Sequence, residues 1–216
     1  MCAIVVAYDT ATAIELFKLN SYRGVHSHSV AIFDEYDGLI FLHQGEGELD
    51  PSLLNNFKRG TIVMHSQAPT TQNSGIHPAA LVDIDDNAYL LWHNGIIKPY
   101  VIEELKQKYN LETDWDTQLI LNEFLMDANY SIDGSYACVM YRYPKVDELT
   151  GNIQIFRNEI APLFYSHRGI SSTKFEGSIP VPANQVFTLV NRALIQFDDD
   201  PSFKTVNNPY YIPERY

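Results

Sequence analysis

Cys2 is the residue of this chain best placed to carry out chemistry, because it lies at the second position, ahead of an apolar run. Loss of Met1 would leave a thiol and a free α-amine on one residue. A thiolate attacks carbonyl carbons, and an α-amine with a pKa of about 7.7–8.0 moves protons near neutral pH. Position alone favours a structural interpretation, since cysteine packs like a small hydrophobic residue. The downstream sequence His93-Asn94-Gly95-Ile96-Ile97 reverses that preference.

Composition and charge limit the partners of the chain. Its 216 residues are 45% hydrophobic and 19% charged, which is typical of a folded protein with a sizeable core. The formal net charge of −12 repels a phosphate backbone, so we expect no nucleic-acid partner. The N-terminal apolar run is too short to span a bilayer and no basic segment precedes it, so we expect no membrane partner.

The cysteines and histidines argue against a metal or a cofactor. Cys2 and Cys138 form no Cys-x-x-Cys pair, and nothing in the sequence supports a disulfide between them. His26 and His28 are too few for a metal site. Cys138 lies in an apolar stretch and is predicted to be a core residue. We therefore expect no metal, no cofactor and a location in the reducing cytoplasm.

Hydrophobic patterning in the first half of the chain predicts several strands and two helices. Residues 2–8 are nearly all apolar, as in a strand buried on both faces. Residues 10–20 have the spacing of an amphipathic helix, and residues 51–58 are predicted to form a helix capped by Asp50. Further strands are predicted at 30–33, 39–42, 61–65, 79–83 and 88–92, with a polar loop at 66–73 and residues 93–95 directly after the last strand.

The middle of the chain is predicted to be helical, and the remainder to return to strands. Pro99 begins a helix in which Ile102, Leu105 and Tyr109 share a face, and residues 114–117 open a second helix. Strands are predicted at 136–141, 153–156, 163–165, 185–189 and 193–197. Strands, then two helices, then strands indicate two packed sheets with helices on their outer faces.

Several short motifs follow one another along the chain: Met1-Cys2-Ala3-Ile4, Tyr22-Arg23-Gly24, His65-Ser66-Gln67-Ala68-Pro69-Thr70, His77-Pro78, His93-Asn94-Gly95-Ile96-Ile97, Asp116-Thr117-Gln118 and Pro162-Leu163-Phe164-Tyr165. In this order they resemble the class II, N-terminal-nucleophile glutamine amidotransferase domain. That domain occurs in asparagine synthetase, amidophosphoribosyltransferase and glucosamine-6-phosphate synthase, and the similarity extends from Cys2 to about Leu189. It implies an α+β fold, a four-layer αββα sandwich of two antiparallel sheets of the N-terminal nucleophile hydrolase type.

The resemblance implies catalytic roles for three residues. Cys2 would attack the side-chain amide carbon of glutamine, with its own α-amine as the base. The side-chain amide of Asn94 and the backbone N–H of Gly95 would hold the oxyanion, and such donors contribute on the order of 3–4 kcal/mol each. Taken without the family, Asn94-Gly95 is a common turn dipeptide.

The resemblance also implies a substrate-binding set. Asp116 would pair with the α-ammonium group of glutamine, and Thr70 and His77 would line the site of the α-carboxylate. The structural interpretation of Asp116 is that of a helix cap. His77 has a structural interpretation too, as a hydrogen-bonded residue that takes no part in proton transfer.

Gln67 departs from the family pattern, which places an arginine there to bind the substrate carboxylate through two charged contacts. Losing a charge-assisted contact costs about 1.5–3 kcal/mol, which corresponds to about a ten- to hundredfold loss of affinity. Three explanations are open: another cation such as Arg23 supplies the charge, the substrate is not free glutamine, or activity has been lost.

We therefore expect one catalytic domain at 1–197 and an irregular tail at 198–216, which is too short for a second domain. The predicted function is that of a stand-alone glutaminase, which hydrolyses L-glutamine to glutamate and ammonia through a Cys2 thioester. The ammonia would be supplied to a separate synthase subunit. Two alternatives stay open: an amidase for a different amide substrate, and a degenerate glutaminase fold that acts as a non-catalytic binding protein.

Overall fold

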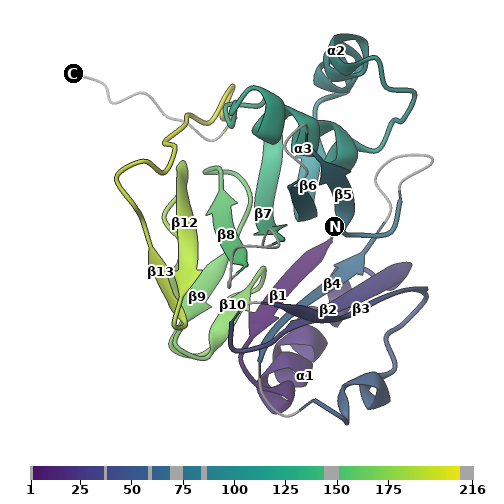
Figure 1. Cartoon of the computed structure of the whole chain (residues 1–216), viewed down its shortest axis with the longest axis vertical. Helices are drawn as coiled ribbons and strands as arrows, with labels where there is room; N and C mark the ends of the chain where they lie inside the picture. Colours follow the sequence, from purple (N-terminus) through teal and green to yellow (C-terminus); the bar gives the residue numbers. More distant parts are fainter. Residues whose placement is uncertain are drawn as a thin grey trace.

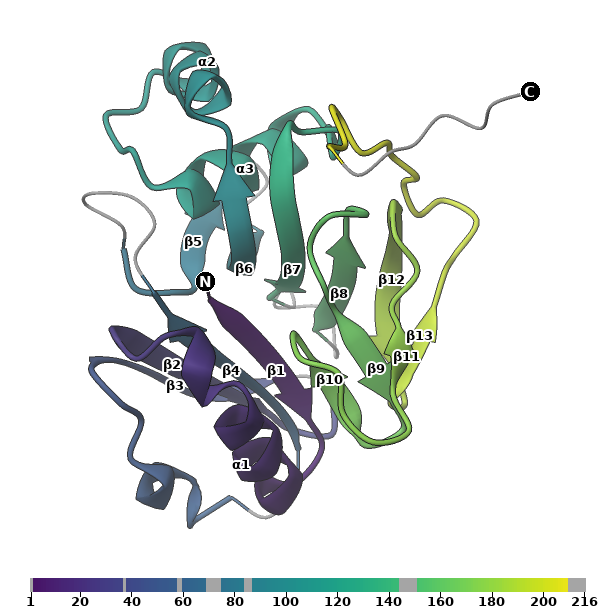
Figure 2. The same ribbon diagram turned by 180° about the vertical axis from the view of Figure 1, so that it is seen from behind.

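Two antiparallel sheets lie face to face in the computed structural model, which describes residues 2–36, 38–57, 60–68, 75–83, 87–143 and 151–209. Within these ranges, sheet A has the strand order β11-β9-β10-β1-β4-β2-β3 and sheet B the order β13-β12-β8-β7-β6-β5. Helix α1 covers the outer face of sheet A, and α3 and α2 lie on the outer side of sheet B (Figure 1; Figure 2 shows the reverse side). The predicted four-layer αββα sandwich is confirmed.

The predicted strands and helices occur in the predicted order along the chain. The strands of sheet A are β1 Ala3–Ala7, β2 Ser27–Phe33, β3 Leu39–Glu46, β4 Thr61–Gln67, β9 Phe164–Ser166, β10 Gly169–Ser171 and β11 Ile179–Pro180. The strands of sheet B are β5 Ala79–Val82, β6 Ala88–Ile97, β7 Gly134–Arg142, β8 Asn152–Arg157, β12 Gln185–Val190 and β13 Ala193–Ile195. The helices are α1 Thr10–Leu19, α2 Pro99–Tyr109 and α3 Asp116–Met126, with short 3₁₀ turns at Ser21–Arg23 and Pro51–Leu54.

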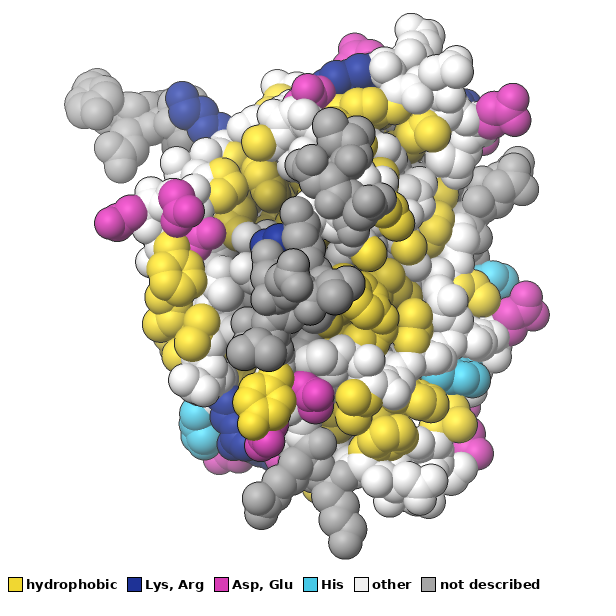
Figure 3. All heavy atoms as spheres, viewed as in Figure 1, with side chains coloured by type: hydrophobic (Ala, Val, Ile, Leu, Met, Phe, Trp, Pro, Cys, Tyr) yellow, Lys and Arg dark blue, Asp and Glu magenta, His cyan; other side chains and the backbone are white. Residues whose placement is uncertain are grey.

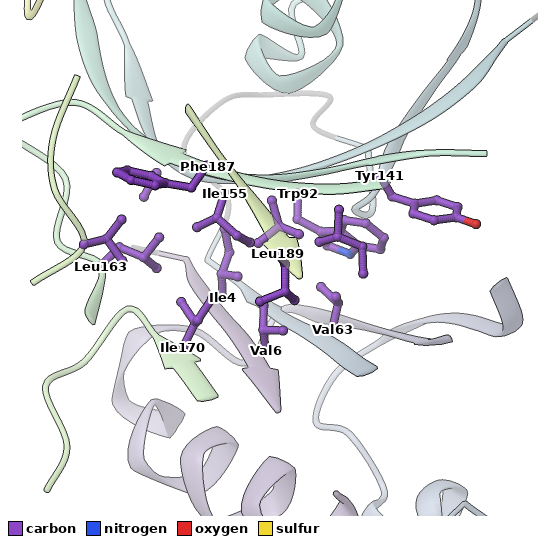
Figure 4. Packing of buried hydrophobic residues seen from close by; sticks show 14 of the residues in the cluster. Ile4, Val6, Val63, Trp92, Tyr141, Ile155, Leu163, Ile170, Phe187 and Leu189 are labelled. Atoms are coloured by element: carbon purple, nitrogen blue, oxygen red, sulfur yellow. The ribbon is translucent and has the colours of Figure 1, made fainter. Parts of the chain in front are cut away.

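Strand β1 is buried on both faces, as predicted. Ile4 and Val6 point into the core between the sheets, where they meet side chains of sheet B such as Trp92 (Figure 4). Val5 and Ala7 point the other way, into the core beneath α1. Because side chains alternate along a strand, the even-numbered residues of β1 face the interface between the sheets.

Three local predictions are wrong. Residues 93–95 do not follow the strand but belong to it, because β6 pairs with β7 from Tyr89 through Ile97. Ser66 and Gln67 are not loop residues, since β4 continues through Gln67 by pairing with β2. The segment at 51–58 is a 3₁₀ turn of four residues, Pro51–Leu54, although Asp50 caps it through a bond from the Ser52 N–H. The short strands β10 and β11 were not predicted.

The described residues beyond β13 contact the rest of the domain at a few points. Val206 forms an isolated bridge with Asp133, and the ring of Phe203 lies 5.7 Å from that of Tyr130. The division of the chain at residue 197 stays a prediction. On the face seen in Figure 3, acidic side chains lie mainly around the outline and hydrophobic ones gather nearer the middle. Among the described residues, no helix has the length and apolar character needed to cross a bilayer.

Candidate functional site

Cys2 lies just before β1, at the end of sheet A that faces β6. It is 5% exposed, and its thiol donates to the carbonyl of Ala68 at 3.5 Å. Arg23 holds the backbone, because its Nε donates to the Cys2 carbonyl at 2.9 Å. The pairing of Ala3 with Ser66 brings Cys2 beside Gln67 at the end of β4. The thiol is thus held in place at the start of a central strand of sheet A.

Burial is the largest influence on the Cys2 thiol and raises its pKa. The negative charge of Asp116 raises this pKa further, whereas the positive charge of Arg23 lowers it. A thiol with a raised pKa is protonated at neutral pH, so nucleophilic attack requires a base beside it.

Asn94 is placed by the alternation of β6, which directs Leu90 and Trp92 into the inter-sheet core and Asn94 to the same side. Its side chain is 3% exposed, and its Nδ2 donates to Ser172 Oγ at 3.2 Å. The backbone N–H of Ile4 donates to the same oxygen at 3.0 Å. Ser172 therefore joins the start of β1 to the middle of β6, and through them the Cys2 segment to Asn94.

Gly95 follows Asn94 at a position where the neighbouring strand leaves no room for a side chain. A Cβ there would lie 1.8 Å from the Ser135 carbonyl oxygen on β7, closer than any side chain can approach. A pocket of about 90 Å³ opens beside this pair, and its lining is Arg23, Asn94, Gly95, Ile96, Ser135, Ala161 and Pro162. The Asn94 amide and the Arg23 cation thus share this pocket, and Arg23 also contacts the Cys2 backbone.

Asp116 begins α3 and is 5% exposed. Its Oδ1 accepts from the Thr117 N–H at 2.8 Å and lies 3.8 Å from Nδ1 of His93. Its Oδ2 is buried and has no hydrogen-bond partner among the residues that the structure describes. Because buried carboxylate oxygens normally accept hydrogen bonds, this atom is available to a donor from a ligand.

Gln67 is 3% exposed and is fixed by three hydrogen bonds. Its Nε2 donates to the Gly75 carbonyl at 3.1 Å, and its Oε1 accepts from the Ser27 hydroxyl at 2.8 Å. Nδ1 of His77 lies 3.4 Å from the same Oε1, so this nitrogen is the donor. The side-chain amide is therefore held in one orientation.

His77 connects Gln67 to the start of α3. Its Nε2 lies 2.9 Å from Thr117 Oγ1, and its ring stacks on that of His65 at 3.9 Å between centroids. Its ring lies nearly perpendicular to that of Trp115, with 5.3 Å between the ring centroids. Thr117 also lies 3.3 Å from Nδ1 of His93. Gln67, His77, Thr117 and Asp116 thus form one continuous hydrogen-bonded chain.

Burial holds His65 and His77 in the neutral form. It lowers the pKa of His65 to about 3 and that of His77 well below its usual range. Both pKa values rise to the ordinary value of about 6.5 on unfolding. The unfolded chain therefore binds more protons than the folded one between about pH 3 and 6.5, and stability present above this window is lost as the pH falls through it.

We accordingly expect the free energy of unfolding to fall by several kcal/mol between about pH 7 and pH 4, at about 1.4 kcal/mol per unit of pKa difference. Urea denaturation at a series of pH values measures this slope. His65→Gln should reduce the slope, whereas His167→Gln, at an exposed position, should leave it unchanged. Equal slopes for wild type and His65→Gln would contradict the lowered pKa assigned to His65.

The predicted site residues fall into two groups around Cys2. Arg23, Asn94 and Gly95 share the small pocket, whereas Gln67, His77 and Asp116 belong to the hydrogen-bonded chain. Thr70 lies outside the described residues. Sequence inspection missed two further residues, Ser172 and Trp115. Ser172 belongs to no motif, so the sequence does not indicate its role. Trp115 directly precedes Asp116, and this position is a signal from which its role in the site could have been predicted.

A cysteine at position 2, at the end of a strand in one of two face-to-face antiparallel sheets, is typical of N-terminal-nucleophile folds. Comparison with known proteins makes this more specific. No family model matches the chain. A putative glutamine-hydrolysing asparagine synthetase 1 of Methanocaldococcus jannaschii is 24% identical over 162 residues, which are 72% of this chain and 27% of the relative.

Two solved structures share the fold. The glutamine phosphoribosylpyrophosphate amidotransferase of B. subtilis, complexed with ADP and GMP, superposes with a TM-score of 0.63 at 13% identity over 91% of this chain and 49% of its own. A structure described as the allosteric regulatory enzyme of purine biosynthesis gives 0.61 at 14% identity over 90% and 48%. This chain thus spans about a quarter of the sequence relative and half of each structure. The predicted resemblance is confirmed: the chain is similar to class II glutamine amidotransferases in sequence and has their fold.

Proposed function

We propose that this chain hydrolyses the side-chain amide of glutamine and releases ammonia. The Cys2 thiolate attacks the amide carbon, and the resulting oxyanion accepts hydrogen bonds from the Asn94 side chain and the Gly95 N–H. The C–N bond then breaks, nitrogen leaves as ammonia with the proton from the thiol, and a thioester remains on Cys2. Water hydrolyses the thioester and restores the thiol.

The observation that carries this proposal is the bridge between nucleophile and amide donor. Ser172 Oγ accepts from both the Ile4 N–H and Asn94 Nδ2, which ties the segment that follows Cys2 to the residue proposed for the oxyanion. Asp116 Oδ2, which no described residue contacts by a hydrogen bond, supports the proposal further, because a buried carboxylate oxygen suits the α-ammonium group of an amino acid.

Removal of Met1 is part of the proposal, since it gives Cys2 a free α-amine. The raised pKa of the thiol makes such a base necessary, and an α-amine titrates in the suitable range. Cys2 in peptide linkage would lack this base.

Intact-mass spectrometry of the full chain, with and without an electrophilic glutamine analogue, tests the proposal. We expect the mass of a chain without Met1 and the addition of one analogue per molecule, at Cys2. Cys138 is an internal control, because it is fully buried and its pKa is raised well above the usual value. Retained Met1, or no addition at saturating analogue, would contradict the proposal.

The use of the ammonia is a further part of the proposal. The curated relative is by its name a synthetase that hydrolyses glutamine. We propose that a separate synthase subunit receives the ammonia from this chain. The isolated chain should then release its ammonia into solution, where a coupled glutamate dehydrogenase assay detects it.

A further inference from the structure

We propose that the preferred substrate is a glutamine whose α-amine is free and whose α-carboxyl group is blocked as an amide, as in the N-terminal glutamine of a peptide. This inference rests on the proposed function and narrows its substrate. It follows from the neutral side chain of Gln67, from the position of Arg23, and from the Asp116 oxygen that has no hydrogen-bond partner among the described residues.

Gln67 offers one neutral donor to a substrate. Its Oε1 has two lone pairs, and the donors on Ser27 and His77 occupy both. Of its two amide N–H groups, one donates to the Gly75 carbonyl. The remaining N–H suits a carbonyl oxygen, which needs a single donor, better than a carboxylate, which needs charge or several donors when it leaves water.

The positive charge that a substrate α-carboxylate requires is not directed at Gln67. Arg23 donates from its Nε to the Cys2 carbonyl and from its Nη1 to the Tyr22 hydroxyl, and it lines the pocket with Asn94 and Gly95. His65 and His77, which lie next to Gln67, are held neutral by burial, which lowers the pKa of each. The adjoining sequence at 69–74, Pro-Thr-Thr-Gln-Asn-Ser, contributes no lysine or arginine.

Asp116 fixes which end of the substrate meets Gln67. The two residues are joined through Thr117, whose N–H donates to Asp116 Oδ1 and whose hydroxyl contacts His77. We infer that they bind neighbouring groups of one ligand. Oδ2 of Asp116 attracts an ammonium group, and the same charge repels a carboxylate on the adjacent substituent. An ammonium group beside a neutral carbonyl is the arrangement in an N-terminal residue of a peptide.

The reaction on such a substrate follows the same thioester route. Cys2 forms the thioester with the side-chain carbonyl, ammonia leaves, and water releases a peptide that begins with glutamate. The α-amide bond is neither formed nor broken.

The wild-type chain alone tests the inference. We expect kcat/KM for ammonia release to be about tenfold or more higher for the dipeptide Gln-Gly and for L-glutaminamide than for L-glutamine. N-acetyl-glutaminamide should be a poor substrate, because its α-nitrogen carries no charge for Asp116. A higher kcat/KM for L-glutamine would overturn this inference and leave the proposed function intact. No ammonia from any substrate, together with an unlabelled Cys2, would overturn both.

The variant Gln67→Arg provides a second test of the inference. The new guanidinium group should raise kcat/KM for L-glutamine relative to L-glutaminamide by about ten- to a hundredfold. Gln107→Arg is the matched control, since it places the same charge on an exposed part of α2 and should leave the ratio unchanged. Should Gln67→Arg fail to fold, the wild-type comparison still decides the question. An unchanged ratio in a folded variant would overturn the role assigned to Gln67.

Discussion

Cys2→Ala is expected to lower ammonia release by about 10⁵- to 10⁶-fold, the scale of loss when a nucleophile is removed from groups that act as a unit. Alanine has no electron pair to form the thioester, so the two-step route disappears. The fold should remain, because the Cys2 side chain contributes a weak hydrogen bond to the Ala68 carbonyl at 3.5 Å and alanine keeps the backbone carbonyl that Arg23 contacts. A coupled ammonia assay measures the rate, and thermal denaturation checks the fold.

Cys138→Ala is the matched control for this loss. Cys138 is also a buried cysteine, but it lies on β7 and packs into the core beneath α2 and α3. Its replacement should lower stability by the cost of a small cavity and leave kcat unchanged. Equal rates for wild type and Cys2→Ala, or loss of activity in Cys138→Ala with the fold intact, would be incompatible with Cys2 as the nucleophile.

Asn94→Ala is expected to lower kcat by about 10²- to 10³-fold, with little change in KM. The reason is that its amide N–H is proposed to donate to the substrate oxygen most strongly once that oxygen carries a negative charge. The ground state, in which the oxygen is a neutral carbonyl, loses less. Steady-state kinetics with L-glutaminamide and with L-glutamine separates the two parameters.

Asn122→Ala provides the comparison. Asn122 is 8% exposed, and its Nδ2 donates to the Gln118 carbonyl within α3 at 2.8 Å, so its removal costs a partly buried side-chain amide hydrogen bond. Both variants should lose about 1 kcal/mol of stability, and only Asn94→Ala should lose activity. A rise in KM with unchanged kcat would instead assign Asn94 to ground-state binding.

The site followed from the sequence only in part. The motifs identify Cys2, Asn94 and Asp116 as candidates because each carries a distinctive group in a distinctive neighbourhood. They do not reveal that Ser172 joins β1 to β6, since that serine lies 78 positions beyond Asn94 and has no motif of its own. Likewise the sequence identifies Gln67 as unusual, and the structure adds that Ser27 and His77 fix its amide in one orientation.

The sequence by itself determined the layers of the fold. The alternation within β1 and the apolar faces of α2 and α3 are local patterns with periods of two and 3.6 residues, so they specify which side of each element is buried. The order of strands, two helices and strands along the chain then predicted two sheets with helices on their outer faces.

Tertiary structure decided where strands end and which charges meet. The segment 93–97 remains in β6 because β7 pairs with it as far as Ile97, although Asn-Gly is a turn sequence in isolation. In the same way Arg23 lies with Asn94 and Gly95, whereas Gln67 lies with His77 and Asp116. These groupings depend on contacts between residues far apart in the chain, and such contacts have no local signature because packing of whole elements produces them.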